Sequence, residues 1–117
     1  MAGDSVPMLK GTVDLLIMQA LASRATHGYG VMRWIEAATG ATLQVDEGSL
    51  YPSLYRLEDR GWVVSEWGLS ENNRRARFYR LTPKGRTQLK NETSEFLRFA
   101  RAMFRALEVP VGELSTR

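Results

Sequence analysis

The side chains that could carry chemistry in this chain of 117 residues are mostly arginine and lysine, and they gather in one segment. Seven of them lie between Asn72 and Lys90, where there is no acidic residue. Residues 1–71 hold five Lys/Arg and nine Asp/Glu, a balance of −4, whereas residues 72–117 hold eleven and four, a balance of +7. A basic block beside an acidic half is typical of a protein with a localised anionic partner. Because a charge run alone is more often a solvated surface, the neighbouring segments have to support that interpretation.

Residue types that suit catalysis are scarce. His27 is the single histidine and cysteine is absent, so one chain cannot assemble a metal site of the usual His/Cys type. A triad of Ser49, His27 and Asp46 can be written down, but no nucleophile elbow or oxyanion loop accompanies it. Gly28 and Gly30 are too close together for a nucleotide-binding loop. We expect neither catalysis nor a cofactor nor a metal, and we expect His27 to fix the start of the next helix by hydrogen bonding, with a phosphate contact as the alternative.

Composition and size favour one globular domain in a reducing compartment. The hydrophobic fraction of 44% and the charged fraction of 25% are those of ordinary soluble proteins. No apolar run approaches the length of a membrane span, and the N-terminal residues MAGDSVPMLKG do not read as a signal peptide. The lack of cysteine fits the cytoplasm, and no membrane partner is expected.

The basic block follows a segment with the sequence DEGSLYPSLYRLEDRGWVVSEW, which predicts a helix and then a strand. Three apolar residues recur at i, i+4 and i+7 and form one stripe: Leu50, Leu54 and Leu57. Proline is tolerated only in the first turn, so Pro52 predicts a helix start near Gly48 or Ser49, capped by Asp46 or Ser49. Gly61 then ends the helix.

The other side of this helix is small, hydroxylated and cationic, and carries Ser49, Ser53, Arg56 and Arg60. Arg56 and Arg60 can reach base edges or phosphates. Ser49, Ser53 and Tyr51 can donate to phosphates, and a helix N-terminus is itself an anion site. Taken alone, an ordinary amphipathic helix explains this face as well; the basic loop that follows favours DNA.

That loop joins two predicted strands, 62–67 and 76–81, and the loop residues 68–75 read GLSENNRR. A helix followed by a basic hairpin is the succession of a recognition helix and a wing. Upstream, apolar spacing predicts helices over 12–23, with Thr12 as N-cap, and over 29–39, ending at Gly40. Residues 24–28 are predicted as a connection and 43–45 as a short extended segment.

The last predicted helix spans 83–108, with Thr82 as N-cap and Pro83 as its first residue. Its apolar residues are spaced four, three, four, three and four apart, which is a heptad seam: Leu89, Thr93, Phe96, Ala100, Met103 and Leu107. The helix is about 35 Å long, longer than a small core needs, so we expect it to pair with a second copy. The predicted organisation is a leader (1–8), a mainly α winged helix-turn-helix domain with a small β-hairpin (9–82), a dimerisation helix (83–108) and a tail (109–117).

Three motifs in these segments resemble one known family. They are HGY at 27–29, GSLYPSLYRLEDRGW at 48–62 and YRLTPKG at 79–85. Together they resemble the phenolic-acid-decarboxylase regulator (PadR) family of winged-helix transcription factors, over about residues 9–85. The single C-terminal helix resembles that of the family's compact subgroup. The segments VDEGSLYP and WGLSENNRRARFYRLT are similar to those of members from acidobacteria.

The resemblance implies a homodimer held together by the last helix, with the recognition helix in the major groove of a pseudo-palindromic operator in double-stranded DNA and the wing along the backbone or minor groove. By position it assigns DNA contact to Ser49, Tyr51, Pro52, Ser53 and Arg56, and to the wing residues Asn72, Asn73, Arg74, Arg75 and Arg77. Gly30 departs from the polar or acidic residue of many members. The last helix has phenylalanines and no tryptophan, so a ligand specificity is not transferred.

The main prediction is therefore a DNA-binding regulator, a homodimeric repressor that a small aromatic effector could relieve. Two alternatives stay open. One is a winged-helix dimer that sequesters a ligand or binds a protein without specific DNA binding. The other is a small hydrolase, whose activity would be sensitive to His27→Ala.

Overall fold

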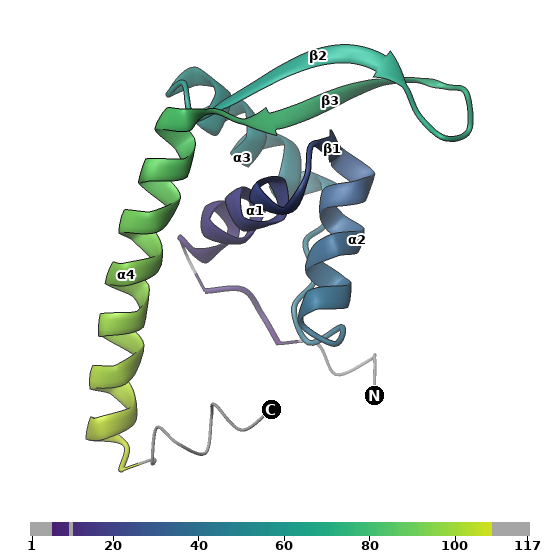
Figure 1. Cartoon of the computed structure of the whole chain (residues 1–117). Coiled ribbons are helices and arrows are strands. Elements are labelled where there is room, and N and C mark those ends of the chain that lie inside the picture. The colour runs from purple at the N-terminus through teal and green to yellow at the C-terminus, as the bar shows by residue number, and fades with distance from the viewer. Residues whose placement is uncertain (1–5, 10, 109–117) are drawn as a thin grey trace.

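Four helices and three strands make up the chain in the computed structural model, which describes residues 6–9 and 11–108 (Figure 1). In order they are α1 (Thr12–Ser23), β1 (Thr26–His27), α2 (Gly28–Ala38), α3 (Glu47–Asp59), β2 (Val63–Leu69), β3 (Arg75–Leu81) and α4 (Pro83–Ala106). The predicted tail 109–117 and residues 1–5 of the predicted leader lie outside the described residues. No helix in the described ranges is long and apolar enough to cross a membrane.

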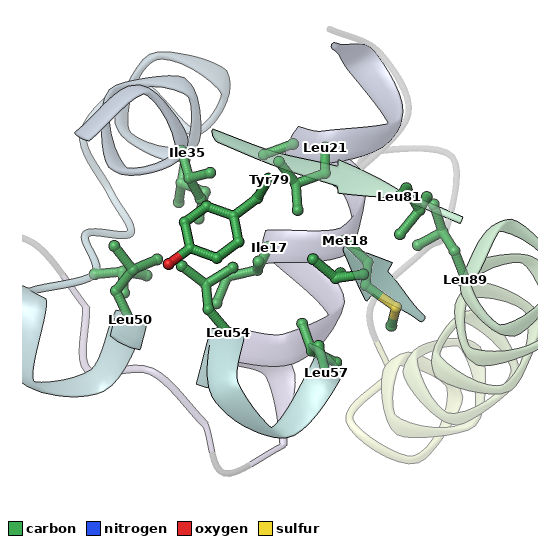
Figure 2. Packing of buried hydrophobic residues seen from close by; sticks show 14 residues of the cluster. Ile17, Met18, Leu21, Ile35, Leu50, Leu54, Leu57, Tyr79, Leu81 and Leu89 are labelled. Atoms are coloured by element: carbon green, nitrogen blue, oxygen red, sulfur yellow. The ribbon is translucent and has the colours of Figure 1, made fainter. Parts of the chain in front are cut away.

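The core is built around α1, which contacts α2, α3, α4 and β3. Figure 2 shows its side chains surrounded by residues from those elements. The predicted stripe of α3 is confirmed, because Leu50, Leu54 and Leu57 are all 0–1% exposed. Each such side chain contributes about 1.5–3 kcal/mol by leaving water. The inner side of α3 is therefore held firmly against α1.

Asp46 caps α3, as predicted, because its side chain accepts a hydrogen bond of 2.9 Å from the backbone N–H of Ser49. The helix starts at Glu47, so the predicted start near Gly48 or Ser49 is one or two residues late. Pro52 is consequently the sixth helical residue, and the expectation that it must lie in the first turn is wrong. The strong cap starts the helix early, and the buried leucines on either side of the proline keep it helical.

The sheet has the order β1-β3-β2, with all neighbours antiparallel. Segment 24–28, predicted as a connection, contains β1, which pairs Thr26 with Tyr79 and His27 with Phe78. Two residues are too few for an alternating pattern, so only the partner strand reveals β1. The predicted extended segment 43–45 is not a strand; there the N–H and carbonyl of Leu43 both bond to the Thr39 hydroxyl.

The start of α1 differs from the prediction. Gly11, with φ +89°, is the N-cap, and Thr12 is the first helical residue. The Thr12 hydroxyl donates to the carbonyl of Leu9 instead of capping. Glycine adopts this left-handed backbone without strain, so the chain can turn sharply into the helix.

Helix α4 begins as predicted: Thr82 accepts a hydrogen bond of 2.9 Å from the N–H of Gly85, and Pro83 is the first helical residue. Leu89 is 8% exposed and belongs to the core of its own chain, so its assignment to a dimer seam is wrong. Beyond Leu89 no residue of α4 is buried. The C-terminal half of α4 extends past the other helices (Figure 1).

Candidate nucleic-acid interface

The two long strands form the predicted wing, and their register decides which side chains share a face. Val63 lies opposite Leu81, and both are buried in the core. Because side chains alternate along a strand, the same face continues outward with three further pairs: Ser65–Tyr79, Trp67–Arg77 and Leu69–Arg75. The inner face of the wing thus changes from apolar at its base to cationic and aromatic toward its tip.

A cleft of about 590 Å³ lies between this inner face and the N-terminal ends of α2 and α3. On the helix side it is lined by His27, Gly28, Tyr29 and Tyr51. On the wing side its charged and aromatic lining consists of one acidic residue, three arginines and two aromatic residues: Glu71, Arg74, Arg75, Arg77, Trp67 and Tyr79. The cleft therefore combines aromatic faces with a concentration of positive charge.

The three arginines that line the cleft fall into two groups. Arg74 and Arg75 are exposed, and neither has an acidic partner within ion-pair distance among residues 6–9 and 11–108. Arg77 is occupied: its Nε donates to the Ser65 hydroxyl at 2.9 Å, and its guanidinium lies 3.7 Å from the carboxylate of Glu58. Ser65 also donates to Glu58 at 2.6 Å. Arg77 thus ties the wing to α3, in addition to the DNA contact predicted for it.

Ser53 and Arg56 also have partners within the chain. Ser53 is 3% exposed, so its predicted place on the outward face of α3 is wrong. Its hydroxyl accepts a hydrogen bond of 3.0 Å from Arg56. The same guanidinium donates to Asp14 of α1, also at 3.0 Å. Arg56 would have to leave a carboxylate before it could contact a base.

The exposed surface of α3 near its N-terminus includes Ser49, Tyr51 and Pro52, all predicted contacts, and also Tyr55. Tyr55 is 76% exposed, the most exposed large hydrophobic residue in the described ranges. The sequence pattern did not single it out, although it lies four residues after Tyr51 and so on the same side of the helix. Arg60 is at the opposite end of α3, with its guanidinium 5.2 Å from the centre of the Trp62 ring.

Tyr51 packs closely against the start of α2. A Cβ at residue 28 would overlap the Tyr51 hydroxyl and lie 2.8 Å from its Cζ, which accounts for glycine at that position. Burial raises the pKa of Tyr51, with a smaller contribution from Glu47. Burial is also the main cause of the raised pKa of Tyr79. Both phenols therefore stay neutral in the cleft at ordinary pH.

His27 fixes the start of α2, as predicted. Its Nδ1 accepts a hydrogen bond of 3.1 Å from the N–H of Gly30, so a neutral ring carries its proton on Nε2. That nitrogen lies 3.3 Å from Glu71 in the wing loop. The pKa of Glu71 is lowered, first by its own backbone N–H and then by the bond from His27. A Cβ at Gly30 would overlap the Thr26 hydroxyl, so a larger residue has no room at this position.

This is the arrangement of a winged helix-turn-helix protein: α2, α3 and α4 pack around α1, the outer side of α3 is exposed, and β2 and β3 form an antiparallel wing. Comparison with known proteins gives the particular family. The model of the transcriptional regulator PadR-like family matches residues 17–91, which is more than half of the chain. The chain belongs to this family of transcriptional regulators, and the family is not one of enzymes.

Known relatives agree with this assignment. A transcriptional regulator of Mycobacterium tuberculosis is 33% identical over 93 residues, which are 79% of this chain and 82% of that protein. The structure of a transcriptional regulator from Clostridium thermocellum is 28% identical, with a TM-score of 0.74 over 82% of this chain and 93% of the other. Bacillus subtilis PadR in complex with operator DNA has a TM-score of 0.62 and 20% identity over 70% of this chain and 46% of that one, so it shows a shared fold.

Proposed function

We propose that this chain is a homodimeric repressor of the cytoplasm that binds a pseudo-palindromic DNA operator, with α3 in the major groove and the wing along the sugar-phosphate backbone. The observation that carries the proposal is the cleft between the N-terminal end of α3 and the arginine-bearing face of the wing. The Bacillus subtilis protein that shares this fold was crystallised with its operator, which supports the same kind of partner here.

Electrostatics supports the wing as the contact to the backbone. Arg74 and Arg75 are exposed and have no acidic partner among the described residues, so they can neutralise phosphates without breaking an ion pair. Each phosphate neutralised releases counterions and makes the logarithm of the binding constant fall with the logarithm of salt concentration, with a slope of about −0.9 per contact. Two copies of the wing would engage about four phosphates through these two arginines.

The exposed part of α3 supports entry into the major groove. Ser49 and Pro52 are small and exposed, so the helix backbone can approach the bases closely. Tyr51 and Tyr55 add a hydroxyl and an aromatic face each, which suit phosphates and thymine methyl groups. Arg56 contacts the DNA only after its ion pair with Asp14 has broken.

The exposed apolar residues of α4 support the dimer. Phe96 is 38% exposed, Met103 42% and Leu107 62%. With Thr93 and Ala100 they form one stripe by their heptad spacing. The C-terminal half of α4, which extends past the other helices, is open to a second copy (Figure 1). Pairing two such stripes would remove this surface from water, at about 25 cal/mol for each Å² of apolar area buried. The seam thus starts after Leu89, at Thr93.

A flat aromatic effector between the two copies of α4 would relieve repression. Phe99 is 57% exposed beside the seam, and Phe96 lies within it. Aromatic rings stack on a planar ligand in offset or edge-to-face arrangements. An effector held there would change the angle between the two α4 helices and with it the spacing of the two α3 helices.

Selection of bound sequences from random DNA, followed by fluorescence anisotropy with the selected site, tests the proposal. We expect an inverted repeat with half-sites about one helical turn apart. Replacing Arg74 and Arg75 with alanine should weaken binding to every sequence and reduce the salt slope. The control is Arg101→Ala with Arg105→Ala, which removes the same charge from exposed positions on α4. Equal losses in the two double variants would contradict the wing assignment, and binding without sequence preference would favour the ligand- or protein-binding alternative.

A further inference from the structure

One exposed aromatic side chain on the wing is unusual for its position. Trp67 lies on the inner face of β2, is 55% exposed and lines the cleft. It contributes nothing to the core. A large indole on a solvent-facing hairpin buries little apolar surface, so its contribution has to lie in what it contacts.

Trp67 contacts two arginines of β3. The guanidinium carbon of Arg75 lies 4.6 Å from the ring centre of Trp67, and that of Arg77 lies 5.5 Å from it. Both distances are within the range of cation–π attraction, for which tryptophan is the best ring. Arg77 is opposite Trp67 in the strand register, and Arg75 is one pair further toward the tip. The three side chains therefore form one stack along the inner face.

The two arginines differ in what else holds them. Arg77 bonds to Ser65 and Glu58, so it is anchored to the wing and to α3 whether or not Trp67 is present. Arg75 has no ion pair and no side-chain hydrogen bond to another residue in the part of the chain that the structure describes, and its contact is the Trp67 ring. A long cationic side chain without other partners otherwise samples many rotamers and loses that freedom when it binds.

We propose that Trp67 is a positioning residue for DNA binding. Its ring, braced against α3 through Arg77, holds the guanidinium of Arg75 over the cleft, where it meets a phosphate of the DNA backbone. The inference rests on the proposed function, since it assigns a role within the same interface. Through this stack the distance between the recognition helix and the phosphate contact of the wing is set before DNA arrives.

The stack itself can be tested without DNA. In a proton NMR spectrum of the free protein, the side-chain protons of Arg75 should lie upfield of their random-coil positions because of the Trp67 ring current. The shift should disappear in Trp67→Leu and remain in Val64→Ala, a control at an exposed position on the outer face of the same strand. Random-coil shifts for Arg75 in the wild-type protein would overturn the proposal.

The effect of the Trp67–Arg75 contact on DNA binding is measured by fluorescence anisotropy with the selected operator, across a series of salt concentrations. Trp67→Leu should weaken binding about three- to ten-fold, the effect of ordering one long side chain, and should reduce the salt slope. Trp67→Phe should lose less, because it keeps an aromatic face, and Val64→Ala should bind like the wild type. On an Arg75→Ala background, Trp67→Leu should have almost no further effect.

The outcomes separate the two proposals. If the wild-type protein binds no DNA sequence, the proposed function fails. If the wild type binds and Trp67→Leu binds as tightly as Val64→Ala, the role of Trp67 is wrong while the function stands. The same conclusion follows if Trp67→Leu weakens binding by the same factor with and without Arg75. Equal melting temperatures by circular dichroism show that the compared variants are folded.

Discussion

Replacing Gly28 with alanine should destabilise the protein, although alanine is normally the better helix residue. Gly28 is buried at the start of α2 and has no left-handed backbone angle, so a side chain is not excluded by the backbone. It is excluded by Tyr51, whose hydroxyl and Cζ occupy the place of the Cβ, the latter at 2.8 Å. Real Cβ atoms essentially never come that close, so the tyrosine ring has to move.

The size of the effect follows from the exposure of Tyr51. Burial of a whole tyrosine covers about 150–250 Å². Tyr51 is 44% exposed, so roughly 100 Å² is covered by its neighbours. At about 25 cal/mol per Å², loss of that contact costs about 2.5 kcal/mol. The gain in helix propensity from glycine to alanine is at most about 1 kcal/mol. We expect Gly28→Ala to lower the free energy of unfolding by about 1–2 kcal/mol.

Urea denaturation followed by circular dichroism measures this difference, and a double-mutant cycle assigns it. On a Tyr51→Ala background the clash is gone, so Gly28→Ala should be neutral or slightly stabilising there. Two results would refute the reasoning: a stabilised Gly28→Ala single variant, or the same destabilisation on both backgrounds. Since Tyr51 is also a proposed DNA contact, the single variant should bind the operator more weakly.

Three further outcomes are expected. Asp14→Asn should lower the free energy of unfolding by about 0.5–1 kcal/mol, because its ion pair with the half-exposed Arg56 is lost; operator affinity should rise as Arg56 is freed, and a fall would show that the pair orients α3. Glutamate at both Phe96 and Met103 should give a monomer by light scattering, and a persistent dimer would contradict the α4 seam. Burial raises the pKa of Tyr79 in the folded state, so the unfolded chain releases the phenolic proton first as pH rises; the free energy of unfolding should fall above pH ~10, and less steeply in Tyr79→Phe.

Local patterns were sufficient for the order and type of most elements. The spacing of Leu50, Leu54 and Leu57 placed the inner side of α3 correctly, because a helix with one apolar face can bury only that face. The N-caps Asp46 of α3 and Thr82 of α4 were also predictable, because capping involves residues only a few positions apart. The polar loop between two runs of strand-forming residues marked the wing.

Structural features that depend on contacts between residues far apart in the sequence could not be predicted from local patterns. Strand β1 exists because Thr26 and His27 meet β3 some fifty residues later. Leu89 fits a heptad seam by spacing, yet the fold brings it to the core of its own chain. No local pattern distinguishes a leucine that will meet α1 from one that will meet a second molecule.

The candidate site shows the same division. The sequence alone shows that arginines follow α3, and the motifs indicated the family, which comparison with known proteins confirms. Tertiary structure alone decided which cations have partners: Arg56 meets Asp14, forty-two positions away, and Arg77 meets Glu58. An ion pair depends on two charges within about 4 Å, and that distance is set by packing. The sequence therefore shows where the cationic residues are. The fold decides that Arg56 and Arg77 are paired with carboxylates, whereas Arg74 and Arg75 have no acidic partner in the described chain.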